Sequence, residues 1–212
     1  CNAAGEVVFN TGMMGYPESM TDPSYKGQIL VFTYPLIGNY GIPANSTAKH
    51  GRRSENILKI NNLEANFESS KIHTTGIIVS EYSEKYSHFA AKKSLSDWMK
   101  EEKIPGITGI DTRALTQHLR THGAMLGKIL TENTALAMPF FNPNEVNLVE
   151  QVSIKNPVSY KAKDAKKTVI LLDCGIKNNS IRSFLEREIN VICVPWNYDF
   201  INSKLPKFHG VF

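Results

Sequence analysis

The apolar residues of the N-terminal part fall into short runs that turn-rich stretches separate. We expect strands at Glu6–Phe9, Ile29–Tyr34, Gly76–Ser80, Ile104–Ile110 and Met125–Leu130. Short apolar runs bounded by glycine, proline and asparagine are typical of buried strands. Residues 10–28, between the first two runs, are dense in glycine and proline. This density predicts a loop on a fixed path rather than a helix.

Two amphipathic patterns predict helices. The first has its apolar positions at helical spacing: Leu95, Trp98 and Met99. Ser94 stands before it as a capping residue, and Asp111 stands before a second helix at Thr112–His122. Gly123 is a suitable residue to end that second helix.

Two polar stretches interrupt this pattern. From Ala44 to Ser70 the chain is rich in Asn, Ser, Lys and Glu, which predicts an exposed excursion with a short helix over Glu55–Leu63. Residues Ala135–Tyr160 carry several prolines and asparagines, and lysines follow up to Lys167. We interpret this region as a connector that ends in a solvated linker.

The last stretch has a different pattern. Thr168–Asp173 is a continuous apolar run, as expected for a strand of a parallel sheet. A helix capped by Asn178 or Asn179 follows, and then a second strand at Asn190–Val194. Strand, helix and strand in this order predict one βαβ unit, with a third strand beginning at Val211–Phe212.

Composition and charge exclude several classes of protein. Of 212 residues, 42% are hydrophobic and 21% charged, and the formal net charge is +4. A disordered chain would be less hydrophobic and more highly charged, and lysines spread along the chain argue against nucleic acid as a partner. No run of about 18 apolar residues occurs, so we expect no membrane partner.

The cysteines and the two ends of the sequence give further expectations. Cys1, Cys174 and Cys193 show no metal-binding spacing, so we expect no bound metal and reduced thiols in a cytoplasmic protein. The sequence opens on cysteine rather than methionine and stops on an apolar run, so we expect a piece of a longer polypeptide.

Two patterns suggest catalysis or metal binding, and each has a simpler explanation. Cys174 ends a strand before a glycine, where it could be a nucleophile or a small buried residue at a turn. His118 and His122 have the spacing of a zinc pair on a helix, but His122 could instead complement the helix dipole. We favour the simpler reading in both cases.

Three further side chains could bind a ligand or a partner. Lys177 follows the turn at 173–175 and could hold an anion at a helix N-terminus, but no glycine-rich phosphate motif accompanies it. Arg113 could be exposed beside the Asp111 cap or could hold a partner's carboxylate. Ser24 could cap its own turn or offer a hydroxyl to a ligand. The residues leave the choices for Arg113 and Ser24 open.

Longer motifs carry a resemblance to a known family. They are Phe9–Glu18, Thr21–Gln28, Thr33–Pro43, Ile104–Arg113, Gly123–Lys128, Asp173–Asn179 and Val194–Asn197. In this order they resemble the amidotransferase, or small-subunit, part of glutamine-dependent carbamoyl-phosphate synthase, in the form found in multifunctional eukaryotic enzymes of pyrimidine biosynthesis. The segment Ala44–Lys71 departs from the family in being longer and more polar.

The resemblance implies an α/β fold in two parts. An N-terminal β/β/α swivelling-type domain at 1–160 would dock on the synthetase part, whether fused or separate. A linker at 161–167 would lead to the first βαβ of a doubly wound class I glutaminase domain, truncated at 168–212. The implied enzyme is a ligase that makes carbamoyl phosphate from glutamine, bicarbonate and ATP. ATP and Mg would bind to its synthetase part, with no cofactor in these residues.

The resemblance also implies a site. Ser24 matches the one glutamine-binding position of the family within these residues. The family's catalytic cysteine and histidine would lie beyond residue 212, so we expect no catalytic residue here and no activity of the chain alone. Two other interpretations stay open: an ammonia-dependent relative whose glutamine site has decayed, and a purely structural docking module.

Overall fold

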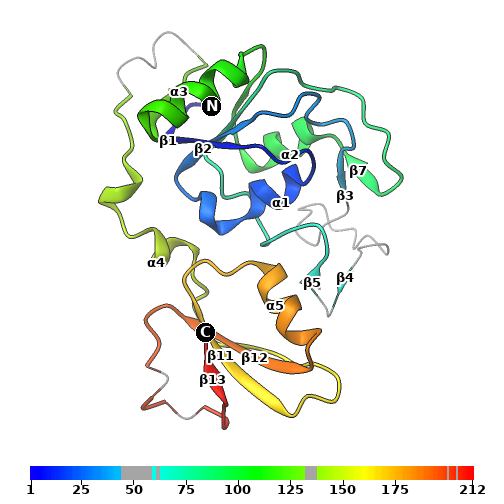
Figure 1. Cartoon of the computed structure of the whole chain (residues 1–212), viewed down its shortest axis with the longest axis vertical. Helices are drawn as coiled ribbons and strands as arrows, with labels where there is room; N and C mark the ends of the chain where they lie inside the picture. The colour runs from blue at the N-terminus through cyan, green and yellow to red at the C-terminus, as the bar shows by residue number, and fades with distance from the viewer. Residues whose placement is uncertain (44–58, 61–62, 132–137, 200, 204) are drawn as a thin grey trace.

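The larger of two main sheets organises the N-terminal part of the chain (Figure 1). The computed structural model describes all residues except 44–58, 61–62, 132–137, 200 and 204. The larger sheet has the strand order β8-β6-β2-β1-β9. Its strands are β1 (Ala3–Asn10), β2 (Gln28–Phe32), β6 (Gly76–Val79), β8 (Gly106–Ile107) and β9 (Met125–Ile129). All neighbours pair in parallel except β9, which runs antiparallel to β1.

Helices cover both faces of this sheet (Figure 1). They are α1 (Tyr16–Thr21), the 3-10 turn η1 (Pro23–Tyr25), α2 (Leu95–Glu102) and α3 (Thr112–His122). Side chains alternate along β2, so that Leu30 and Phe32 join the core beneath α1 and α2, whereas Ile29 and Val31 join the core beneath α3. Because both faces of β2 are buried, this central strand is apolar at all four positions and contributes side chains to two cores.

The second sheet has the order β10-β12-β11-β13. Its strands are β10 (Val158–Tyr160), β11 (Lys167–Asp173), β12 (Ile189–Pro195) and β13 (Gly210–Val211), and α5 (Asn178–Leu185) links β11 to β12. β11 pairs in parallel with both β12 and β13. The predicted βαβ unit and the start of a third strand are therefore confirmed, and the chain is a mixed α/β protein.

Shorter elements complete the described chain. Two small antiparallel pairs form between β3 (Ile42–Pro43) and β7 (Ala91–Lys93), and between β4 (Lys59–Ile60) and β5 (Leu63–Glu64). The 3-10 turn η3 (Pro143–Glu145) and helix α4 (Leu148–Val152) lie between the two sheets along the chain. None of the helices in the described residues is long and apolar enough to span a bilayer.

Residues 10–28 differ from the continuous loop that the sequence predicts. Gly15 takes a left-handed φ of 87° at the N-cap of α1, and a proline occupies the first turn of that helix. Both residues are compatible with a helix start, because the first turn needs no backbone donor from proline. The glycine and proline that predict a loop mark a helix boundary instead.

The polar stretch from residue 44 onward also differs from expectation. Most of the helix predicted over Glu55–Leu63 lies outside the described residues, but β4 and β5 occupy its described end. The stretch is not wholly exposed either, because Phe67 is 1% exposed and meets Trp98 edge-to-face at 5.8 Å between ring centroids. One large aromatic side chain thus anchors this polar segment in the core beneath α2.

Two predictions near the second sheet are wrong in detail. The pattern predicts a connector at residues 158–160, but they form β10 and pair antiparallel with β12. The N-cap of α5 is Lys177 rather than Asn178 or Asn179, and its side chain makes no capping bond to the described residues. Pairing with a distant strand decides the first point, and hydrogen-bond acceptors from a distant segment decide the second. Neither interaction can be recognised in the sequence around these residues.

Candidate functional site

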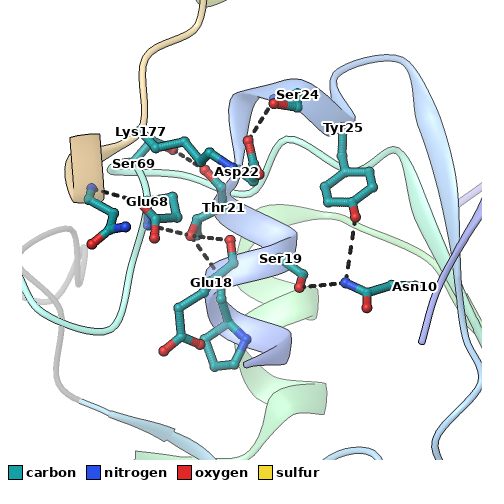
Figure 2. Close-up of polar contacts among 12 residues, drawn as sticks. Asn10, Glu18, Ser19, Thr21, Asp22, Ser24, Tyr25, Glu68, Ser69 and Lys177 are labelled. Atoms are coloured by element: carbon teal, nitrogen blue, oxygen red, sulfur yellow. Dashed lines mark hydrogen bonds and ion pairs between the residues drawn. The ribbon is translucent and has the colours of Figure 1, made fainter. Parts of the chain in front are cut away.

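Ser24 lies in a turn whose backbone is fixed by its neighbour. Asp22 is the N-cap of η1, and its Oδ1 accepts a hydrogen bond from the Ser24 amide at 2.9 Å (Figure 2). Ser24 itself is exposed, and its hydroxyl makes no hydrogen bond to any residue that the structure describes. Of the two roles left open, capping of the turn therefore belongs to Asp22, and the hydroxyl is available to a ligand.

The turn that carries Ser24 lies against the end of β11. The second carboxylate oxygen of Asp22, Oδ2, is 3.2 Å from the Lys177 ammonium. A Cβ built on Gly175 would come within 3.3 Å of the Pro23 Cβ, and Gly175 has a positive φ of 102°. The positive φ favours glycine there, and the contact leaves little room for a side chain. Lys177, a candidate for anion binding in the sequence, is thus paired with Asp22.

A second set of contacts supports the turn from the side of the larger sheet. Asn10 donates from its amide to the Ser19 hydroxyl at 2.9 Å and lies 3.5 Å from the Tyr25 hydroxyl (Figure 2). Burial, followed by the nearby Asp22 carboxylate, raises the pKa of Tyr25. The Tyr25 phenol therefore stays neutral, and its hydroxyl can hydrogen-bond to Asn10 beside the turn.

A cavity of about 350 Å³ lies between these two parts of the chain. Its lining includes Pro23, Lys71, His73, Ile154, Asp173 and Cys193. The Asp173 carboxylate accepts three backbone N–H bonds, from Ile154, Gly175 and Ile176, at 2.7–3.0 Å. It is therefore a structural acceptor that shapes the end of β11.

Two other groups lining this cavity are neutral near pH 7. Burial, with smaller contributions from Lys71 and Lys26, lowers the pKa of His73 to about 4. Its buried Nδ1 has no hydrogen-bond partner within the described part of the chain. Burial raises the pKa of the Cys193 thiol to about 12, which leaves it without the thiolate that a nucleophile requires.

Cysteine and histidine were the other candidates for chemistry. Cys174 is exposed, so the favoured expectation that it is a small buried residue at the turn is wrong. The buried cysteine is Cys193. The rings of His118 and His122 are tilted by 34° with their centroids 4.2 Å apart, and His122 Nδ1 lies 3.0 Å from the His118 carbonyl. No group of three or more metal-ligating side chains occurs among the residues described.

The caps predicted for two helices are confirmed. Asp111 Oδ1 accepts the Ala114 amide at 2.9 Å, and Gly123 ends helix α3. The Ser94 hydroxyl accepts the Asp97 amide at 3.0 Å at the start of α2. Arg113 is exposed and forms no ion pair with the residues that the structure places, so its partner-binding role stays a prediction.

The structure adds residues that the sequence did not single out. Asp22 carried a usable signal, because an Asx residue followed by proline is a common start of a helical turn. Glu68 carried none, since its bonds reach Asn178, Asn179 and Arg182 more than a hundred residues away. Local sequence reasoning cannot identify a contact of that separation.

Comparison with known proteins decides the family. Residues 1–129 match the model of the "Carbamoyl-phosphate synthase small chain, CPSase domain" family. The chain belongs to this family. It is 46% identical to the multifunctional protein ura1 of Schizosaccharomyces pombe over 94% of the chain. It is 48% identical to the multifunctional protein pyr1-3 of Dictyostelium discoideum over the whole chain.

A third relative of the chain is a much shorter protein. The arginine-specific small chain of carbamoyl phosphate synthase from Saccharomyces cerevisiae is 47% identical over the whole chain. The chain spans 49% of that small chain but only 10% of the two multifunctional relatives. The resemblance drawn from the sequence motifs is therefore confirmed at the level of the family.

Proposed function

We propose that this chain is part of a glutamine-dependent carbamoyl-phosphate synthase, the ligase that forms carbamoyl phosphate from glutamine, bicarbonate and ATP. Membership of the small-chain family and identity near one half with relatives of both kinds support the assignment. In this proposal the product feeds pyrimidine biosynthesis, with arginine biosynthesis as the alternative outlet. ATP and Mg bind to the synthetase part, fused or separate, and the enzyme works in the cytoplasm.

The two sheets take separate roles in this proposal. Residues 1–160 form the swivelling-type domain that docks on the synthetase part, except that β10 at the end of this range pairs with β12 of the second sheet. The βαβ unit at 168–212 is the first part of the glutaminase domain, and the linker is residues 161–167. Docking is supported by exposed apolar side chains on three loops that hydrogen bonds tie together. They are Met13, Met14, Leu36, Tyr86 and Phe89.

One observation carries the glutamine role of Ser24. Its hydroxyl is exposed and unbonded among the described residues, while Asp22 fixes its backbone and joins the turn to Lys177 of the βαβ unit. A hydroxyl can both donate to a carboxylate and accept from an ammonium group. Ser24 is therefore suited to bind the amino-acid head group of glutamine, although the cavity between the two parts is lined by its neighbour Pro23 and not by Ser24 itself.

The test compares two nitrogen sources in the complete enzyme. Loss of one neutral hydrogen bond costs about 0.5–1.5 kcal/mol, so Ser24→Ala should raise the apparent constant for glutamine about threefold to tenfold. Synthesis driven by ammonia should stay nearly unchanged, because ammonia bypasses the glutaminase site. Ser159→Ala, at another exposed serine, on strand β10, is the matched control and should change neither rate.

Two results would contradict this proposal. Equal loss of glutamine-driven and ammonia-driven synthesis would assign Ser24 to docking instead. Unchanged glutamine use in Ser24→Ala would show that the Ser24 hydroxyl makes no such contact. A decayed glutamine site or a purely structural module would instead appear as a lack of glutamine-driven synthesis by the unsubstituted enzyme. Residues 1–212 alone should release no glutamate from glutamine, because no cysteine among the described residues is hydrogen-bonded to a histidine.

A further inference from the structure

Glu68 joins the Ser24 turn to the βαβ unit through four contacts. Its amide donates to the Thr21 hydroxyl at 2.9 Å. Its carbonyl accepts the Asn178 amide at 2.9 Å, and its carboxylate Oε2 accepts the Asn179 amide at 2.8 Å. Its other carboxylate oxygen lies 3.6 Å from Arg182. The labelled side chains of Figure 2 show Glu68 between the end of α1 and the start of α5.

On one side, Glu68 caps a helix to which it does not belong. The first amides of a helix lack partners within it, and Lys177 at the N-cap of α5 supplies no side-chain bond from the described chain. Glu68 satisfies the amides of Asn178 and Asn179 instead. A carboxylate at this end is favoured by the helix dipole and by Arg182, which is itself 5% exposed.

On the other side, Glu68 holds the residue that precedes the Ser24 turn. Thr21 is 1% exposed, and its hydroxyl, which accepts from Glu68, also donates to the Pro17 carbonyl at 2.7 Å. The neighbouring Ser69 hydroxyl donates to the Thr21 carbonyl at 2.7 Å. Asp22, the cap of the Ser24 turn, is the next residue. The path from α5 to Ser24 thus consists of short contacts around a buried threonine.

We propose that Glu68 is a positioning residue for glutamine use, and this rests on the role proposed above for Ser24. Its backbone amide holds Thr21 and its carboxylate holds the start of α5, so that it fixes the distance between the Ser24 hydroxyl and the βαβ unit. A displacement of about 1 Å at a reacting site can cost on the order of a hundredfold in rate. A second tie, between Asp22 and the half-exposed Lys177, is weaker because solvent screens it.

The experiment measures glutamine-driven and ammonia-driven synthesis by the complete enzyme. Glu68→Ala removes the carboxylate that accepts the Asn179 amide and pairs with Arg182, and keeps the two backbone bonds. It should lower kcat/KM for glutamine by about tenfold or more. Glu68→Gln keeps an acceptor for the Asn179 amide but loses the charge, so its loss should be smaller. Ammonia-driven kcat should change by less than about twofold in both variants, because it does not depend on the site.

Glu186→Ala is the matched control, since Glu186 is an exposed carboxylate at the other end of the same helix. It should leave both rates unchanged. If Glu68 served only stability, both nitrogen sources would lose kcat together in proportion to the folded enzyme, and that result would overturn the proposal. The proposal would also be overturned if the Glu68 variants used glutamine with the same kinetics as Glu186→Ala. If Glu68→Ala does not fold, Glu68→Gln alone decides between these outcomes.

Ser24→Ala measured in parallel separates the two proposals. If Ser24→Ala impairs glutamine use and the Glu68 variants do not, only the positioning role fails. If Ser24→Ala leaves glutamine use intact, the proposed site itself fails. If the Glu68 variants then lose glutamine-driven but not ammonia-driven synthesis, another residue between the larger sheet and the βαβ unit makes the contact to glutamine.

Discussion

The stability of this chain should depend on pH through His73. This side chain is 4% exposed, and burial is the main reason that its pKa falls from 6.5 to about 4. Lys71 and Lys26 lower it further, whereas Asp22 and Asp173 oppose them. The folded protein therefore keeps a neutral imidazole under conditions in which the unfolded chain would bind a proton.

The sign and size of the effect are set by linkage. Between about pH 6.5 and pH 4 the unfolded state binds the proton and the folded state does not, so the free energy of unfolding falls as pH falls through this window. A pKa difference of one is worth about 1.4 kcal/mol, which gives a maximum of about 3 kcal/mol from this one group. The contribution is fully present above about pH 6.5.

The assay is denaturant unfolding at several pH values between about 7 and 4, with His73→Asn as the comparison. Asparagine has a polar side chain that does not titrate. Between about pH 7 and pH 4 the free energy of unfolding of His73→Asn should therefore fall by up to about 3 kcal/mol less than that of the unsubstituted protein. Other titrating groups cancel between the two proteins. Identical slopes, or an imidazole pKa above about 6 measured by NMR in the folded chain, would refute the reasoning.

Two further predictions concern stability. Asp111→Ala should lower the free energy of unfolding by about 0.5–2 kcal/mol, because the Ala114 amide loses its cap; thermal unfolding checks this, with the exposed Arg113→Ala as control. Phe67→Ala should cost about 3–5 kcal/mol through the cavity left against Trp98, whereas Phe89→Ala, at a side chain 92% exposed, should cost little. Similar losses for the two phenylalanines in denaturant unfolding would show that residue 67 is not held in the core.

Where the determining interactions are local, the sequence predicted the structure. The βαβ unit can be predicted from apolar runs of strand length around an amphipathic helix, and the parallel pairing of β11 with β12 is expected from that order. The caps at Ser94 and Asp111 depend on side chains that reach amides three residues on. In each case the partner lies within one turn or one supersecondary unit.

Where two signals compete locally, the sequence misled. Glycine and proline at 10–28 fit both a loop and the start of a helix, and packing of Tyr16 and Met20 into the core beneath α1 decided for the helix. Residues 158–160 resemble a connector because their lysine-rich surroundings dominate the pattern. Pairing with β12 made them a strand. Burial and pairing are tertiary properties that outweigh local preference.

By itself, the sequence determined the family, the α/β class and the choice of Ser24 as the glutamine candidate. The tertiary structure alone decided how that residue is held. Asp22 fixes the turn, and Glu68 caps α5 from a segment more than a hundred residues away in the chain. A helix end needs an acceptor but does not specify which part of the chain supplies it. Only folding brings Glu68 to the amides of Asn178 and Asn179, and with them the two parts of the proposed site.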